Sequence, residues 1–191
     1  MIFVSSIVAL ISGTPQFRIK EDLSDAAPTY FFYGQSEIEE DLIGSSAELG
    51  NRRQIKTFDS VGTTATGDVI FSLISGKATI VQASHSGYLL TQNYVKMTPS
   101  SSIDAQYLVY LVNEDAAIRH QLQSSQQGSV TLKYTIKQLN TLMISPLPSI
   151  EKQKAIGDLY FSQLKLAALK RRVSELETTL VLGRIKEANQ L

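Results

Sequence analysis

The segment from Ser149 to Leu191 constrains the fold of this chain more than any other part of it. Two prolines, Pro146 and Pro148, end whatever precedes it, and no proline follows as far as Leu191. Ser149 is placed as a helix N-cap, and Glu151 falls in the first turn, where the helix dipole favours an anion. The sequence therefore predicts one helix from about Ser149 to about Ala188, roughly 55 Å long at ~1.5 Å per residue.

Apolar residues recur along this helix with the spacing of a coiled coil. Ser162 and Gly183 are weak d positions in the same pattern. A helix of this length cannot be buried against one small domain, so we expect a second helix to cover the stripe. We call the stripe the leucine seam; its members are Leu159, Leu166, Leu169, Val173, Leu176 and Leu180.

The chain before the prolines is mixed and turn-rich, which predicts an α+β fold. We expect a domain with an irregular, twisted sheet over 1–145, followed by one long C-terminal coiled-coil helix in 146–191. The helix over 103–113 would begin after Ser102 as its cap, and Thr135 with Gln138 forms a possible capping box. Strands are expected within 1–11 and over 68–74, 79–82, 94–97 and 142–144, and a second helix over 114–123.

The apolar N-terminus has a competing interpretation as a targeting signal. No Lys or Arg precedes Arg18, so the positive region of a signal peptide is missing, and the stretch is too short to span a bilayer. A buried strand is the favoured interpretation. The chain contains no cysteine, which excludes disulfides and thiolate metal sites and suits a cytoplasmic location.

Charge is balanced overall but not along the chain. The formal net charge is +0, yet residues 1–50 carry 2 basic and 8 acidic side chains, a net charge of −6. The excess centres on Glu37, Glu39, Glu40 and Asp41. Such a run is usually a solvated face; the alternative is an acidic patch that docks a basic partner.

No catalytic constellation is evident. His85 and His120 are far apart, and neither belongs to a metal-ligand pattern. A structural role, satisfied or exposed, is the better interpretation of each. Gly62 and Gly67 have the spacing of a phosphate loop, but Asp68 replaces the lysine that such a loop requires. The sequence therefore favours a non-catalytic binding protein without a cofactor or metal.

The polar side chains that are present suit contact with DNA. Asn and Gln bridge the edge of adenine, while Arg and Lys read guanine or bind phosphate. Serine–glycine loops offer backbone N–H groups to phosphate oxygens. The candidate DNA-binding residues are Arg52, Arg53, Lys56, Lys77, Gln92, Asn93, Gln126, Gln127, Ser129 and Lys133.

Several motifs together give the chain a family resemblance. The most specific is the pattern P-L-P-x-x-x-x-Q-x-x-I at 146–156, and the others are short segments at 12–15, 67–72, 76–77, 91–93 and 127–129. Together they resemble a target recognition domain plus one connecting helix of a type I restriction–modification specificity subunit. The resemblance covers nearly the whole chain.

The resemblance implies a function without catalysis. Subunits of this family read DNA and carry methyltransferase and sometimes nuclease subunits. They usually contain two recognition domains and two antiparallel helices, so this chain resembles half a subunit. The leading hypothesis is a DNA-recognition module that homodimerises through its C-terminal helix, reads a bipartite symmetric site on double-stranded DNA and recruits methyltransferase subunits.

Two other classes of function stay open at this point. A regulatory or structural protein would use the same helix to bind a specificity or methyltransferase subunit without reading DNA. An enzyme with an unrecognised site is the third class. DNA affinity that falls steeply with salt and differs among sequences would separate the first hypothesis from the second.

Overall fold

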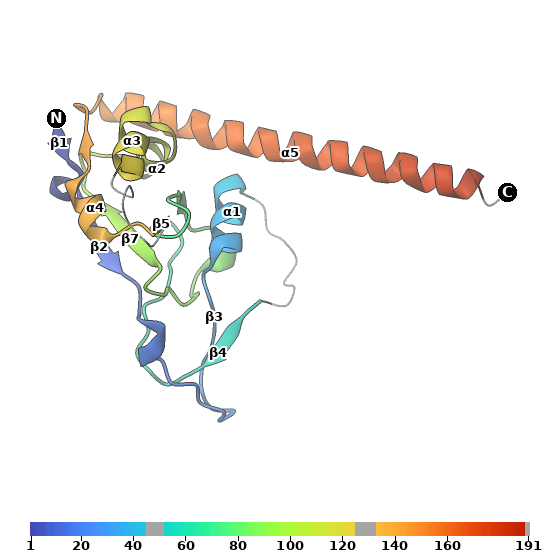
Figure 1. The fold of residues 1–191 in the computed structure, drawn as a ribbon, viewed down its shortest axis with the longest axis horizontal. Helices are drawn as coiled ribbons and strands as arrows, with labels where there is room; N and C mark the ends of the chain where they lie inside the picture. The colour runs from blue at the N-terminus through green and yellow to red at the C-terminus, as the bar shows by residue number, and fades with distance from the viewer. Residues whose placement is uncertain (45–51, 125–132, 190–191) are drawn as a thin grey trace.

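A computed structural model describes residues 1–44, 52–124 and 133–189 of the chain. It consists of a mixed α/β domain and one long helix, α5, that runs along one end of the domain and projects well beyond it (Figure 1). None of the described helices is both long and apolar enough to cross a membrane.

In the part of the chain that the structure describes, short antiparallel strands form three small sheets. The largest has the order β2-β7-β5-β6, from Val8–Ser12, Tyr94–Pro99, Val69–Ser72 and Ala78–Ile80. β5 lies inside this sheet and is buried along its whole length, as the apolar residues Val69, Ile70 and Phe71 predict. The two-stranded sheets pair β1 (Ile2–Phe3) with β8 (Met143–Ile144), and β3 (Thr29–Phe31) with β4 (Gln54–Lys56).

The N-terminal apolar run belongs to the domain, but it is not one strand. A 3-10 turn, η1 (Val4–Ser6), separates β1 from β2 and sends them to different sheets. Two further 3-10 turns, η2 (Gln16–Arg18) and η3 (Ala83–His85), follow later in the chain. The strands predicted within 68–74, 79–82, 94–97 and 142–144 are confirmed as β5, β6, β7 and β8.

Within the described ranges, four short helices complete the domain. They are α1 (Gln35–Ile43), α2 (Ala105–Glu114), α3 (Ala116–Ser124) and α4 (Ile136–Thr141). The capping box at the start of α4 is confirmed, with Thr135 Oγ1 accepting from the Gln138 N–H. The predicted cap of α2 was wrong: Asp104, not Ser102, accepts from the N–H groups of Gln106 and Tyr107. Ser102 Oγ instead shares a hydrogen bond with Ser100 Oγ in the preceding turn.

α5 covers Ile150–Ala188, 39 residues, and begins at the predicted cap, since Ser149 Oγ accepts from the Lys152 N–H. Its first turns pack against α2. Gln153 is 1% exposed; its Nε2 donates to the carbonyls of Ser102 and Pro148, and its Oε1 accepts from the Asp104 N–H. α2 and α5 pack closely here: a Cβ added at Gly157 would lie 2.6 Å from Cβ of Gln106, so only glycine fits at this position.

The leucine seam faces away from the domain. At ~100° of rotation per residue, its members lie on roughly the opposite side of α5 from Gln153, Gly157 and Tyr160, which pack on α2. Every member is exposed, from 45% at Leu166 to 71% at Leu159. The domain therefore leaves the seam uncovered, as the length of the helix predicts.

Candidate nucleic-acid interface

A polar cleft of about 470 Å³ opens on the domain beside the start of α1. We call it the polar cleft. The segment between β3 and α1, together with α1 itself, supplies one part of its lining, and the two residues before β4 supply another. The turn before β7, the first residue of β7 and the first residue of η2 supply the rest. Its lining residues are Gln16, Phe32, Tyr33, Gly34, Gln35, Ser36, Glu37, Glu40, Arg52, Arg53, Thr91, Asn93 and Tyr94.

Close backbone contact brings two distant segments of the chain together at this cleft. The Thr14 N–H donates to Leu90, the Gln92 N–H donates back to Thr14, and the Gly13 N–H donates to the carbonyl of Tyr94. Only glycine fits at position 13, because a Cβ there would lie 2.2 Å from the carbonyl oxygen of Thr91. The Ser12–Pro15 motif thus fixes where the chain enters the cleft.

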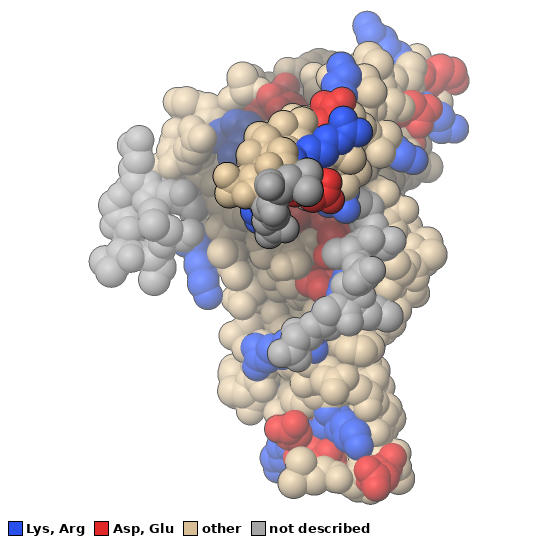
Figure 2. Space-filling view, turned by 90° about the vertical axis from the view of Figure 1, so that its right-hand side faces the viewer, with Lys and Arg blue, Asp and Glu red and all other residues tan. Residues whose placement is uncertain are grey.

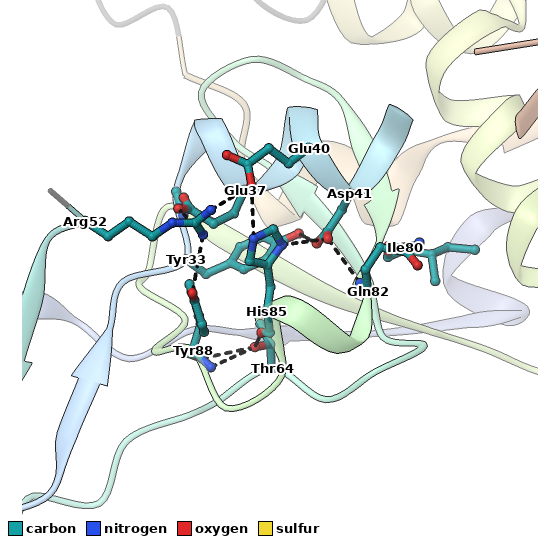
Figure 3. A network of polar contacts seen from close by, with 11 residues as sticks. Tyr33, Glu37, Glu40, Asp41, Arg52, Thr64, Ile80, Gln82, His85 and Tyr88 are labelled. Carbon is teal, nitrogen blue, oxygen red and sulfur yellow. Dashed lines mark hydrogen bonds and ion pairs between the residues drawn. The ribbon is translucent and has the colours of Figure 1, made fainter. Parts of the chain in front are cut away.

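A buried polar network supports the cleft from beneath (Figure 3). Asp41, 1% exposed, accepts from the Tyr33 hydroxyl at 2.6 Å and from the Gln82 N–H at 3.1 Å, and it bonds His85 Nδ1 at 2.7 Å. Burial and the charge of Asp41 raise the pKa of Tyr33 far above its usual value, so the phenol stays a donor. His85 is the structural histidine that the sequence predicts.

Arg52 closes the same network on its solvent side. Its guanidinium donates to Glu37 at 3.1 Å, to Glu40 at 2.8 Å and to the Tyr88 hydroxyl at 3.3 Å. Burial acts against the charged form, yet the hydrogen bond and charge of Glu40 outweigh it and raise the pKa of Arg52. Glu40 also lies 3.2 Å from His85 Nε2, out of line for a hydrogen bond.

Both predictions for the acidic run were therefore wrong. Glu37 and Asp41 are 7% and 1% exposed, and of the four acidic residues only Glu39 is exposed, so the run as a whole is neither a solvated face nor an open docking patch. Positions 37, 40 and 41 share one face of α1, which turns inward onto Arg52 and His85. Among the described residues, no cluster of His, Asp and Glu is arranged to hold a metal ion.

Several of the predicted DNA-binding residues meet at or beside the polar cleft. Arg53 lies over the ring of Phe32, 4.4 Å from its centroid, and no carboxylate among the described residues is within ion-pair distance of it. Asn93 lines the cleft and accepts from Lys133 Nζ at 3.3 Å, and Gln92 is exposed next to it.

Other predicted residues lie apart from the cleft. Lys56, at the far end of β4, pairs with Asp25 at 3.2 Å. Lys77 is exposed in the β5–β6 turn, directly after Gly76, which packs on the ring of Tyr134. Gln126, Gln127 and Ser129 lie outside the described residues. Arg52 lines the cleft, but its donors are engaged inside the domain.

Sequence reasoning missed several side chains of the cleft, among them Gln16, Phe32 and Gln35. Gln16 directly follows the Ser12–Pro15 motif, so its neighbourhood was marked although the residue was not. Phe32 and Gln35 carry no local signal, because their place depends on the pairing of β3 with β4 and on where α1 begins. Charge gives little guidance either: on the face seen in Figure 2, basic and acidic side chains are interspersed.

Comparison with known proteins supports the fold. No protein-family model and no curated protein matches the chain. The HsdS subunit of Thermoanaerobacter tengcongensis is similar in structure, with a TM-score of 0.55 and 20% identity over 90% of this chain and 38% of that chain. A structure from work on complex assembly and conformational transition of the type I R-M system has a TM-score of 0.60 and 20% identity over 94% of this chain and 42% of that chain.

A third solved structure agrees. The type I restriction–modification S subunit of M. genitalium matches with a TM-score of 0.51 and 12% identity, over 96% of this chain and 42% of that chain. The chain thus spans about two fifths of the length of each of these three proteins. At these identities the likeness concerns the fold alone, and it confirms the predicted α+β domain followed by one long helix.

Proposed function

We propose that this chain is a non-catalytic, sequence-specific DNA-recognition module of a type I restriction–modification system. The observation that carries the proposal is the combination of the S-subunit fold with a polar cleft that is lined by amide side chains and by the Arg53 guanidinium. Residues 1–145 form the target recognition domain, and 146–191 form the dimerisation and spacer helix. The module needs no cofactor, and it works in the cytoplasm, where the cell's DNA is found.

The leucine seam supports homodimerisation. Its six apolar side chains are exposed on the projecting part of α5, and removing them from water would stabilise a pair of helices. An antiparallel pair would place one domain at each end, which is the arrangement the resemblance implies for a complete subunit. Two copies would also make up most of the length that separates this chain from the S subunits it matches.

A second apolar surface on α5 supports recruitment of methyltransferase subunits, and of restriction subunits with them. Val181, Leu182 and Ile185 are 53%, 54% and 58% exposed. Leu182 and Ile185 lie on the side opposite the leucine seam, at ~100° per residue. The outer positions of a two-helix coiled coil are normally polar, so this patch favours a further helical partner.

We assign the DNA contacts by chemical type. Amides and Arg53 read base edges, whereas Lys77 and Lys133 bind phosphates. Arg52 and Lys56 would have to leave Glu37, Glu40 or Asp25 to reach DNA, so they contribute mainly by positioning β4. The full set of proposed contacts is Arg53, Lys77, Gln92, Asn93, Gln126, Gln127, Ser129 and Lys133.

DNA binding at several salt concentrations, together with selection from randomised duplexes, tests the proposal. The wild-type protein should enrich a defined motif, and its affinity should fall steeply with salt. Lys133→Ala should weaken binding to all sequences and lower the salt slope by about one. Asn93→Ala should instead reduce discrimination at one or two base pairs by about 1–3 kcal/mol.

The rival function is an interaction protein that binds a specificity or methyltransferase subunit without reading DNA. The exposed seam, the Val181–Ile185 patch and a net charge of +0 are the observations that favour it. Under this function the selection returns no motif, while the protein still binds a full-length specificity or methyltransferase subunit. That result would replace the first proposal with the second.

A further inference from the structure

We infer that the polar cleft receives the edge of a nucleobase, not a phosphate, and that Gln16 and Gln35 are specificity-determining residues there. The inference rests on the proposed function, because it assumes that the domain reads DNA. Beyond the proposed function, it names the part of the DNA that the cleft binds. It also names two side chains, Gln16 and Gln35, that the sequence motifs do not mark.

The charges of the cleft cancel. Its lining contains two carboxylates, Glu37 and Glu40, and two guanidinium groups, Arg52 and Arg53, for a formal charge of zero. Glu37 Oε2 accepts from the Gly34 N–H at 2.9 Å, which places a carboxylate at the N-terminal end of α1, where the helix dipole would otherwise favour a bound anion. A phosphate would meet no net attraction here. The edge of a base is neutral and binds through hydrogen bonds, so a site without net charge does not weaken its binding.

The groups that are free to bind match base edges. Gln16 is exposed at the rim, and no described residue hydrogen-bonds its side chain. Lys133 occupies Asn93 Oδ1, which leaves the amide nitrogen as a donor. Gln35 donates to Glu39 at 3.2 Å and accepts from Ser72 Oγ at only 3.5 Å, so its carbonyl oxygen is weakly held. Gln and Asn bond adenine, and Arg bonds guanine.

The cleft is also prepared for recognition. Phe32 stacks on the Arg53 guanidinium. The Gly13–Thr14 backbone bonds hold the chain just before Gln16 against the turn that carries Asn93. The network around Asp41 supports α1 and with it Gln35. Side chains on a rigid support lose little freedom on binding and discriminate better between bases. A volume of about 470 Å³ lies within the range of ligand sites in proteins.

The test compares three single variants of the full chain in duplex selection and in affinity measurements across salt concentrations. Gln16→Ala and Gln35→Ala should each relax the preference at one base-pair position by roughly 5- to 150-fold, which is what one bidentate base contact provides. Their salt slopes should equal that of the wild type. Asn140→Ala, an exposed amide on α4 away from the cleft, is the control and should leave the motif unchanged.

The outcomes separate the inference from the proposed function. If the wild type enriches a motif and both glutamine variants enrich the same motif with the same stringency, the inference fails while DNA reading stands. Equal weakening on all sequences with a shallower salt slope would mean that the cleft binds phosphate, which also overturns it. If the wild-type protein enriches no motif, both the inference and the proposed DNA-reading function are contradicted. Thermal unfolding of each variant verifies that the domain is intact.

Discussion

At the scale of single residues, Gly13 is the position with the least room for a side chain. A Cβ there would lie 2.2 Å from the Thr91 carbonyl oxygen and 2.5 Å from that of Leu90. Backbone on both sides has to move, so Gly13→Ala should destabilise the domain by about 1–3 kcal/mol, as overpacking does elsewhere. Urea unfolding measures the change.

Gly62→Ala is the matched control for Gly13. The nearest atom to a Cβ at Gly62 is Thr14 Oγ1 at 3.5 Å, an ordinary van der Waals distance, and Gly62 lies in the same corner of the domain. This variant should unfold near the wild-type midpoint. Equal stability of Gly13→Ala and Gly62→Ala would contradict this prediction. It would show that the backbone at Gly13 and at Leu90–Thr91 can move apart without loss of unfolding free energy.

Residue types predicted chemistry better than they predicted location. The sequence indicates amides and cations suited to DNA, and Arg53 and Asn93 do line one cleft. It does not show that Arg52 is paired with Glu37 and Glu40. Those partners lie 15 and 12 positions away on a helix, α1, that no strong local sequence pattern predicts. Long-range pairing decides which charges remain free, and spacing along the chain does not encode it.

At the scale of elements, the junction of α2 and α5 gives a pH-dependent prediction. The Tyr160 hydroxyl donates to Glu114 Oε1 at 2.9 Å and accepts from Asn113 Nδ2 at 3.2 Å. Burial raises the pKa of Tyr160 from 10.0 to about 12, and the bond to Glu114 adds to the increase against the opposing effect of Asn113. The protonated phenol is therefore the form that the folded state prefers.

The sign of the effect follows from this preference. A raised pKa contributes stability that is complete below pH 10.0 and is lost as the pH rises toward about 12. Tyr160→Phe should cost about 1 kcal/mol near neutral pH, the net value of a typical hydrogen bond. The difference between wild type and variant should shrink above pH 10.0. Urea unfolding across this range measures it, and a constant difference would contradict the assignment.

Exposure limits the size of this effect. A pKa change from 10.0 to about 12 corresponds to ~2.7 kcal/mol, but Tyr160 is only half-buried and solvent screens its charge, so a smaller loss is expected. Ionisation of other tyrosines with raised pKa values, such as Tyr33, also lowers the stability of the protein at high pH. Comparison with the phenylalanine variant removes their contribution.

The leucine seam gives a second prediction at this scale. Leu169→Glu or Val173→Glu would place a charge in the middle of an apolar helix interface, so each should convert a dimer into monomers. Light scattering at a protein concentration of tens of micromolar measures the mass. Ser174→Glu is the control, because Ser174 is adjacent in sequence but lies away from the seam. A wild-type protein that is monomeric under these conditions would contradict homodimerisation.

Elements with a strong local signal were predicted well. The prolines, the cap and the apolar period mark α5 almost to its observed ends, and the run Val69–Ser72 marks β5. α1 was not predicted, because its charged face turns inward and its apolar residues, Ile38 and Leu42, are too few to show a period. The break of the N-terminal run at η1 is set by pairing with β8 and β7, which the sequence of the run does not reveal.

At the scale of the whole molecule, the length of α5 sets the geometry of any site that two copies read together. Two identical domains on an antiparallel helix pair present identical surfaces related by a two-fold axis, so the site should be a symmetric, bipartite sequence. A separation of ~30–50 Å corresponds to roughly 9–15 base pairs at ~3.4 Å each. The spacer between half-sites should be constant in length and free in sequence.

Shortening α5 tests whether it acts as a ruler. Seven residues removed within 166–183 keep the a/d pattern in register and spare the turns of α5 that pack on α2. In an antiparallel pair this shortens the distance between domains by ~10 Å at ~1.5 Å per residue. The preferred half-sites should then move closer by about 3 base pairs, and each half-site should keep its own sequence, because the polar cleft is untouched.

Removing four residues from the same part of α5 is the control, because it shortens the helix but disrupts the a/d register. That variant should dimerise poorly and should lose the bipartite preference while it retains binding to single half-sites at higher protein concentration. Duplex selection with the dimer, followed by affinity measurements on duplexes with each spacer length, distinguishes these results. An asymmetric motif, or a spacing that ignores the seven-residue deletion, would mean that α5 joins the domains without determining the distance between them.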